Sequence, residues 1–417
     1  MSRIQKYVLW ACIPLSLSLL LCLLADLEPW VKPMAVALAL SVAIGIGSVT
    51  SLNSYQYTFW ILAAIVCALL YPARFLSVGG VDLRNPWLIL IVVQLVMFGM
   101  GTQMSLKDFS GIKSMGKGVL VGIVCQFSIM PLIGFLLTLV FGFEPEIAAG
   151  VVLIGSCSSG LASNVMVYLA KANLTLSVTL TAVATLIAPI MTPLLMKVYA
   201  GTYVEVSFIG MFVQIIKIVI VPIGAAMLYD GLKTLSASFR RKVLISAALS
   251  AVYLMAFILL PIPESIYVFL ELVAFLAGAV MFGLLFYFMT TVVHHLPKLM
   301  PLFSMFGIVY FTLVTTAASR DNILQIGLLL IVVAILHNLL GYTFGYWLSR
   351  IFGMDKQSCR TIALEVGLQN GGMASGLAGV MGKLATLGLA SAVFSPWMNI
   401  SGSILANYWR KKSNLTE

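Results

Sequence analysis

Oxygen-bearing side chains gather at two short, glycine-rich breaks in otherwise apolar stretches of the chain. The first break reads GSCSSGLASNVM (Gly155–Met166) and the second reads EVGLQNGGMASG (Glu365–Gly376). In the second break, Glu365 is followed by Gln369 and Asn370. A carboxylate, amide oxygens and the carbonyls of unwound backbone are the ligands that a hard cation selects. These residue types therefore predict a cation site at the second break.

Two acidic residues, Glu365 and Glu271, lie well inside apolar segments. A charged group at the centre of a bilayer costs about 2.5–3.5 kcal/mol, so an unpaired charge is not expected there. We interpret Glu365 as an ion ligand; the alternatives are an ion pair with Lys217 or a neutral carboxyl group in a polar cluster. Glu271 lies in FLELVAFLAG without polar neighbours, which favours a neutral or interfacial glutamate.

The first break is accompanied by four small polar side chains. Ser163 and Asn164 follow the break directly, while Ser177 and Thr181 are one helical turn apart on the next apolar segment. A single hydroxyl in a membrane helix usually bonds back to its own backbone. Four such groups beside a break favour a ligand site instead.

The elements that must position these groups are membrane spans. Of the 417 residues, 61% are hydrophobic and 9% are charged, whereas soluble domains average about 25% charged. Each break separates apolar half-segments of about ten residues, which is half of what a spanning helix needs. Backbone unwinds in lipid only where protein or a water-filled cavity satisfies its polar groups. A pair of interrupted spans therefore indicates a transporter binding site.

Fourteen apolar segments are predicted to span the membrane. They lie at 7–24, 33–50, 57–74, 87–104, 118–141, 146–170, 175–198, 207–229, 242–261, 267–293, 301–318, 323–348, 359–381 and 385–408. The breaks fall in the sixth and thirteenth segments. This odd separation means that the two cross in opposite directions, as an inverted repeat requires. We expect an all-α polytopic membrane protein.

The basic residues predict the orientation of the spans. Of the 24 Lys and Arg residues, 17 lie on the side of the N-terminus, six lie opposite and Lys217 falls inside a span. Both termini are therefore predicted to be cytoplasmic, in the cell (inner) membrane. The net charge of +10 reflects this distribution and requires no nucleic-acid partner. The first apolar segment lacks a small-x-small cleavage site, which favours a retained anchor over a cleaved signal.

Several stretches resemble the bile acid:sodium symporter family. They include QFSIMPLIGF, EIAAGVVLIGSCSSGLASNVM, HNLLGY, EVGLQNGGMASGLA and SPWMNISGSILANYW, in family order between about Tyr55 and Trp409. The resemblance implies a ten-helix core of two inverted five-helix repeats, with two discontinuous helices crossing near the midplane. A panel of the third, fourth, eighth and eleventh spans would pack against a core domain of the fifth to seventh and twelfth to fourteenth.

Four predicted spans have no counterpart in such a ten-helix core. Residues 1–54 would form an extra N-terminal pair, and residues 55–233 the first repeat with the start of the second. Residues 234–296 would form an inserted pair, and residues 297–417 the remainder of the second repeat with its discontinuous helix. The sequence does not indicate what the two extra pairs do.

The resemblance further implies two bound sodium ions and no covalent cofactor. One sodium would be held by Ser163, Asn164, Ser177, Thr181 and Glu365. The second would be held by Gln126, Glu365, Gln369 and carbonyls near Val366 and Leu368. Every side chain of both sets is present in the chain.

The substrate implied by the resemblance is a small or amphipathic organic anion, bile-acid-like or a small carboxylate. Family members commonly carry Cys-Cys-Pro-Gly-Gly-Thr where this chain has SCSSGL, so Ser159 and Leu161 depart from the pattern. Met398 stands at a family histidine position, whereas Asn370 is retained. We expect Ser159, Leu161, Asn370 and Met398 to contact the substrate, whose identity stays open.

Sodium-coupled symport is the function that the sequence favours. One alternative is a proton-coupled organic-anion transporter or antiporter that uses Glu365; another is a membrane sensor that kept the fold and lost transport. An enzyme is not expected, because the sequence has no nucleophile–base pair, nucleotide loop or metal signature. His337, in HNLLGY, is expected to pack or hydrogen-bond rather than bind a metal. The lipid bilayer, sodium and an organic anion are the expected partners, and the oligomeric state stays open.

Overall fold

The computed structural model describes residues 3–49, 52, 55–105, 108 and 111–414. The end of the second predicted span at residue 50 and the first predicted domain boundary at residue 54 lie outside these residues. The described chain is helical almost throughout, with one small hairpin of two strands, β1 (Ser77–Val78) and β2 (Val81–Asp82). The predicted all-α polytopic fold is confirmed.

Nine helical segments in the described part of the chain are long and apolar enough to cross a membrane. Their elements are α1 (Arg3–Leu24), α2 (Glu28–Gly45) with η1 (Ile46–Ser48), α6 (Gly111–Phe141), α9 (Leu174–Leu195) with η4 (Met196–Ala200), α10 (Phe208–Ile215) with η5 (Ile216–Ile220) and α11 (Val221–Thr234), α12 (Ala237–Leu259), α13 (Glu264–Val292), α14 (Leu296–Ala318) and α15 (Arg320–Ile351).

The remaining five predicted spans coincide with shorter, paired or more polar helices. Two are the single helices α3 (Gln56–Leu70), which continues into α4 (Pro72–Leu76), and α5 (Pro86–Gly101). Two are pairs: α7 (Pro145–Ser156) with α8 (Leu161–Leu169), and α16 (Lys356–Gly367) with α17 (Gly371–Val380). The last is α18 (Leu389–Asn414). Each of the two predicted breaks is therefore a real interruption between two short helices.

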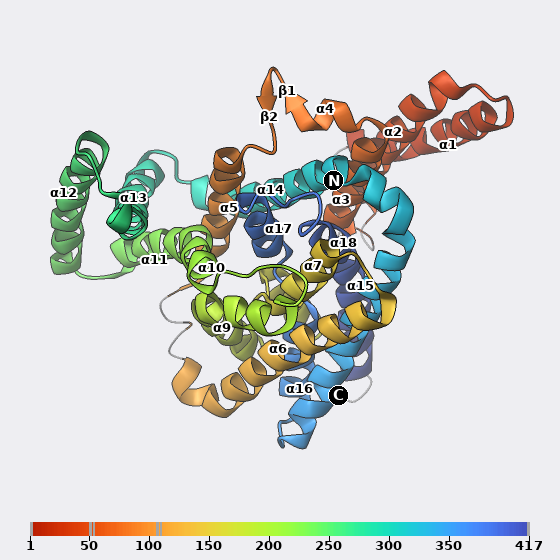
Figure 1. The fold of residues 1–417 in the computed structure, drawn as a ribbon. Helices are drawn as coiled ribbons and strands as arrows, with labels where there is room; N and C mark the ends of the chain where they lie inside the picture. Colours follow the sequence, from red (N-terminus) through yellow and green to blue (C-terminus); the bar gives the residue numbers. More distant parts are fainter. Residues whose placement is uncertain (1–2, 50–51, 53–54, 106–107, 109–110, 415–417) are drawn as a thin grey trace.

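The order long helix, broken helix, long helix occurs twice. The first instance is α6, α7/α8 and α9, and the second is α15, α16/α17 and α18. The two instances pack together: α15 contacts α6, α16 contacts α9, and α18 contacts both α7 and α8. Helices α7, α16 and α17 are buried along nearly their whole length, and α7 and α17 lie near the middle of the view in Figure 1.

Glycines at the second break allow this close packing. A Cβ atom added to Gly367 would lie 2.1 Å from the ring of Tyr342 on α15, and one added to Gly376 would lie 2.4 Å from the side chain of Val93 on α5. Real side chains cannot approach so closely. The glycine-rich composition of the break therefore reflects contacts with neighbouring helices as well as the interruption itself.

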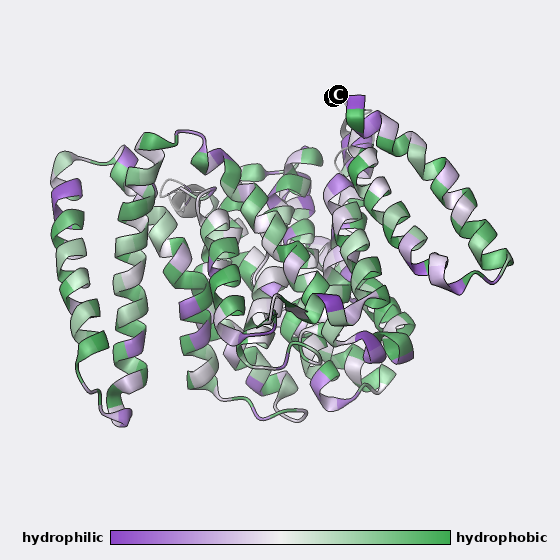
Figure 2. Cartoon of the chain, turned by 90° about the horizontal axis from the view of Figure 1, so that it is seen from above, coloured by the Kyte–Doolittle hydropathy of each residue, from purple (hydrophilic) through white to green (hydrophobic). Residues whose placement is uncertain are grey.

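Two helical hairpins project from this bundle on opposite sides. Hairpin α1–α2 extends from one side, and hairpin α12–α13 stands at the other (Figures 1 and 2). The first hairpin reaches the bundle mainly through α2 and α3, and the second through α13 and α11. Most of their residues are hydrophobic, as the colours in Figure 2 show, and exposed apolar side chains such as Leu17 and Val252 suit helices that face lipid.

Candidate functional site

The two breaks cross each other and form a short piece of antiparallel backbone pairing. Ser159 and Gln369 are bridge partners. The amide of Gly160 donates to the carbonyl of Leu368 at 3.3 Å, and the amide of Asn370 donates to the carbonyl of Ser158 at 2.8 Å. Each break thereby satisfies backbone groups that the other leaves unpaired, which is what an interrupted helix needs in a membrane.

Four helix ends converge at this crossing. Helices α7 and α16 end at Ser156 and Gly367, while α8 and α17 begin at Leu161 and Gly371. Helix C-termini carry partial negative charge and favour cations, whereas N-termini favour anions. One point in the core therefore offers electrostatic complementarity to ions of both signs.

The carboxylate of Glu365 lies at the crossing and is fully buried. It accepts hydrogen bonds from the hydroxyls of Ser159 (2.6 Å), Ser177 (2.5 Å) and Thr181 (2.8 Å). These donors come from the first break and from α9, so residues some 200 positions apart in sequence meet at one carboxylate. These hydrogen-bond partners of Glu365 are neutral hydroxyls. Lys217 does not pair with Glu365, because it forms an ion pair with Glu271.

Asn164 and Ser163, from the first turn of α8, complete this cluster. Asn164 Oδ1 lies 2.7 Å from Ser177 Oγ and 3.3 Å from Thr181 Oγ1. The Ser163 hydroxyl donates to the carbonyl of Gly160 at 2.7 Å and is a further hydrogen-bond partner of Glu365. The structure thus brings together all five side chains of the first predicted sodium set.

Two hydroxyls of this cluster each lie within reach of two oxygen acceptors. Ser177 and Thr181 each own one proton, yet each lies within hydrogen-bonding distance of both Glu365 and Asn164. A hydroxyl can rotate its proton away and present a lone pair instead. Carboxylate, amide and hydroxyl oxygens crowded in this way suit a hard cation, because the cation would supply the positive charge that the protons cannot.

The second predicted sodium set forms an adjoining chain of amide groups. Gln126, on α6, donates to the carbonyl of Cys157 (3.0 Å) and to Oε1 of Gln369 (2.9 Å). Gln369 in turn donates to the carbonyl of Val366 at 2.6 Å. Among the described residues, Gln126 Oε1 is buried without a hydrogen-bond partner. An orphaned buried acceptor is costly, and a cation would satisfy it.

Ser159 belongs to the oxygen cluster around Glu365, which the sequence did not predict. It was expected to contact substrate, but its hydroxyl faces Glu365 and lies 3.4 Å from Thr181 Oγ1. Ser159 lies between α7 and α8, where no helical period applies. Sequence spacing could not place it, and only its alignment with Gln369 in the crossing brings it to the carboxylate.

The other predicted substrate residues lie around the start of α17 and α8. Asn370 caps α17 by accepting a hydrogen bond from the amide of Met373 at 3.0 Å. Met398, on α18, is buried, and its terminal carbon would be 3.8 Å from a Cβ added at Gly371. Leu161 is the first residue of α8 and is partly buried. Met398 therefore lies beside Gly371, the residue that follows Asn370, and the substrate role of all four residues stays a prediction.

The expectation for Glu271 is wrong. Glu271 is not without polar partners: Lys217 Nζ lies 2.5 Å from its Oε2 and also 5.0 Å from the ring centroid of Phe275. The two side chains are 6% and 22% exposed, for Lys217 and Glu271 respectively. The sequence could not reveal this pair, because it joins η5 to the separate hairpin α12–α13. It also removes Lys217 as the partner of Glu365.

His337 has the hydrogen-bonding role that the sequence favoured. Its Nε2 lies 2.8 Å from the carbonyl of Met130, and its ring packs edge-on against Phe394. The histidine thus ties α15 to α6 beside the crossing.

Comparisons with known proteins identify the family of this chain. The profile of the Sodium Bile acid symporter family matches residues 90–271, a stretch that contains the first break. The "Uncharacterized sodium-dependent transporter YocS" of Bacillus subtilis (strain 168) is 32% identical over 357 residues, covering 85% of this chain and 91% of that protein. This chain belongs to the sodium bile acid symporter family.

Two further relatives extend the likeness to proteins with named classes of substrate. The "Probable sodium/metabolite cotransporter BASS1, chloroplastic" of Oryza sativa subsp. japonica is 30% identical over 88% of this chain and 74% of that protein. The ileal sodium/bile acid cotransporter of Oryctolagus cuniculus is 30% identical over 67% of this chain and 65% of that protein. The family is one of sodium-dependent transporters, and this chain is a multi-pass membrane protein of that family.

Proposed function

We propose that this protein is a sodium-coupled symporter that takes up an organic anion by alternating access, with both sodium ions bound at the crossing of the broken helices. The observation that carries the proposal is the buried cluster of carboxylate, amide and hydroxyl oxygens around Glu365. One sodium would lie among Ser163, Asn164, Ser177, Thr181 and Glu365. The other would lie among Gln126, Glu365, Gln369 and the carbonyls of Val366 and Leu368.

An anionic substrate fits the opposite polarity of the same crossing. The N-termini of α8 and α17 lie beside the cation cluster, and helix N-termini attract negative charge. Asn370, Leu161 and Met398 are placed at or near these N-termini. Substrate and sodium would then bind side by side, and each would favour binding of the other by electrostatic attraction.

Ion coupling to the membrane potential gives the proposal a quantitative test. Two sodium ions carried with one monovalent anion move net charge +1, which is worth about 2.3 kcal/mol per 100 mV. In proteoliposomes, uptake of a radiolabelled bile acid, keto acid or sulfonate should rise sigmoidally with external sodium. It should also rise when the interior is made negative.

Replacement of sodium by potassium or choline separates the proposal from its alternatives. Uptake that persists in potassium and follows a pH gradient would indicate proton coupling through Glu365. Saturable sodium binding without flux of any anion in the set would indicate a sensor. Sodium-dependent flux with a sodium Hill coefficient above one supports the two-ion symporter.

A further inference from the structure

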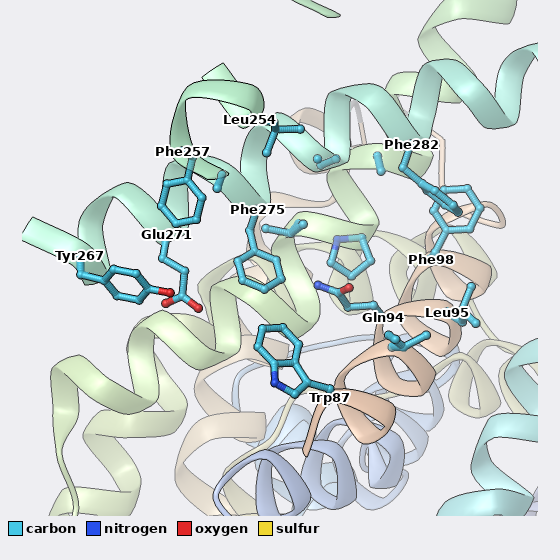
Figure 3. A pocket seen from close by; sticks show the side chains of 17 residues that line it. Trp87, Gln94, Leu95, Phe98, Leu254, Phe257, Tyr267, Glu271, Phe275 and Phe282 are labelled. Carbon is cyan, nitrogen blue, oxygen red and sulfur yellow. The ribbon is translucent and has the colours of Figure 1, made fainter. Parts of the chain in front are cut away.

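A cavity lies away from the crossing, where the hairpin α12–α13 meets the bundle. It has a volume of about 450 Å³ and lies between α5, α11, α12 and α13 (Figure 3). Its walls are mainly apolar and include Phe98, Leu254 and Phe282. The size is typical of a pocket that holds a small-molecule ligand.

Small residues on α13 leave this cavity open. At Gly283 the helix touches α11 so closely that an added Cβ would lie 2.7 Å from the carbonyl of Ala225. At Glu271 it is tied to η5 by the ion pair with Lys217. Between these two attachments, a Cβ added to Gly278 would meet nothing within 4 Å. The hairpin is therefore held at two points with an unfilled gap between them.

One end of the cavity lies at a membrane interface. Trp87, in the first turn of α5, and Tyr267, in the first turn of α13, line this end of the cavity. Their exposed fractions are 66% and 45%. Trp and Tyr gather where the hydrocarbon meets the headgroups. From Trp87 to Phe98, which also lines the cavity, α5 rises about 16 Å at about 1.5 Å per residue. One leaflet of the hydrocarbon core is about 15 Å thick.

The walls favour hydrocarbon over water. Apolar cavities stay dry unless polar partners hold the water, and the two most polar residues of this lining are already engaged. Glu271 is neutralised by Lys217, and the Gln94 side chain donates to the carbonyl of Lys217 at 3.0 Å. Outside the cavity, α12 presents exposed apolar residues such as Val252 and Ile258. Lipid chains therefore surround the cavity on its outer side.

We propose that this cavity binds one acyl chain of a membrane phospholipid, which enters from the leaflet at Trp87 and Tyr267 and fills the joint between the hairpin and the bundle. The chain length that fits is set by one leaflet, because the cavity extends from the interface to Phe98 and Phe282. The bound lipid completes the packing of α13 against α5 and α11. This site is separate from the crossing and does not depend on the proposed transport function.

The test compares substitutions at two glycines, each of which has room for a side chain. Gly278→Phe places a ring in the cavity, whereas Gly224→Phe places the same ring on the exposed face of α11, where an added Cβ also meets nothing within 4 Å. The full-length proteins are purified in mild detergent with extended washing, and retained phospholipid is measured by native mass spectrometry. We expect one phospholipid per chain in the wild type and in Gly224→Phe, and at least a tenfold loss in Gly278→Phe.

Ala279→Leu, from the same wall, repeats the test with a smaller side chain and is used if Gly278→Phe does not fold. Equal retention in the cavity-filling and control variants would overturn the proposal, as would a wild type that retains no phospholipid. Delipidated wild type is also incubated with dioleoyl phosphatidylglycerol in the presence or absence of millimolar cholate. Rebinding of one lipid irrespective of cholate supports the lipid site, whereas one-for-one displacement by cholate would reassign the cavity to an organic anion.

Discussion

Glu365, which is buried, and Glu271, which is partly buried, have opposite surroundings. Glu271 is held by a lysine, so its charge is neutralised within the protein. Glu365 is held by hydroxyl groups, which contribute hydrogen bonds but no charge. A carboxylate already paired with lysine has little to offer a cation, whereas one surrounded by neutral oxygens does. The comparison distinguishes a structural glutamate from a glutamate suited to bind ions, and the following variants test it.

The largest effect is expected from Glu365→Ala, because this carboxylate belongs to both proposed sodium sites. We expect saturable sodium binding, measured by isothermal titration calorimetry, to disappear together with sodium-driven uptake. Glu365→Gln keeps the hydrogen-bonding shape but removes the charge and should behave in the same way. Glu271→Gln is the matched control and should keep wild-type sodium affinity. Unchanged sodium affinity in Glu365→Ala would make this carboxylate structural, like Glu271.

The next effect is on stability and comes from Glu271→Ala. Removing one partner of a buried ion pair leaves the other charge uncompensated and costs about 3–5 kcal/mol. We expect a lower thermal midpoint in detergent, with sodium affinity unchanged. The double variant Lys217→Met/Glu271→Leu removes both charges and should recover most of the loss. If the single variant melted at the wild-type temperature, the pair would contribute nothing to holding the hairpin.

A smaller effect is expected from Thr181→Ala, which removes one neutral oxygen from one sodium site. A contact of this kind is worth about 1 kcal/mol, which corresponds to an approximately fivefold increase in the sodium concentration needed for half-maximal uptake. Gln126→Ala should act similarly through the other site. The double variant should need a higher sodium concentration for half-maximal uptake than either single variant. A loss as complete as that of Glu365→Ala would mean that Thr181 has a role beyond one ligand.

The smallest effect on the sodium dependence of uptake is expected from Leu161→Thr, at the first residue of α8. This change restores the residue that family members commonly carry and adds a hydroxyl near the N-terminus of the helix. Relative uptake rates across a panel of carboxylates and sulfonates should change, while the sodium titration should overlay the wild type. A shifted sodium titration with an unchanged substrate profile would move Leu161 from the substrate region to the ion cluster.

The sequence predicted the breaks well because their causes are local. Glycine and small polar residues inside an apolar run are visible without any tertiary information, and both interruptions lie where that pattern occurs. The five side chains of the first proposed sodium set were grouped by the family resemblance, and the structure brings them together at Glu365, while their role in binding sodium stays a prediction. The prediction of the breaks depended on composition within a single segment, whereas the grouping of the five side chains depended on the resemblance.

What the sequence missed depends on contacts between distant elements. Ser159 reaches Glu365 through the pairing of two irregular segments, for which no periodicity exists. Lys217 and Glu271 meet because the hairpin α12–α13 docks beside η5, and 53 residues separate the two in the chain. From the sequence, Lys217 was considered only as a partner of Glu365, and Glu271 was interpreted as a glutamate without polar neighbours.

The backbone pairing between the two breaks has a mechanical consequence. Because Gly160 bonds to Leu368 and Asn370 bonds to Ser158, the broken helices are joined at their weakest points and resist being pulled apart. Any movement that turns the ion cluster from one side of the membrane to the other must carry both breaks together as one body. The sliding surface then falls at the edges of that body, where α17 meets α5 and α18 meets α3 and α14. During such a movement the paired breaks would stay assembled, and the relative displacement would occur at these helix contacts.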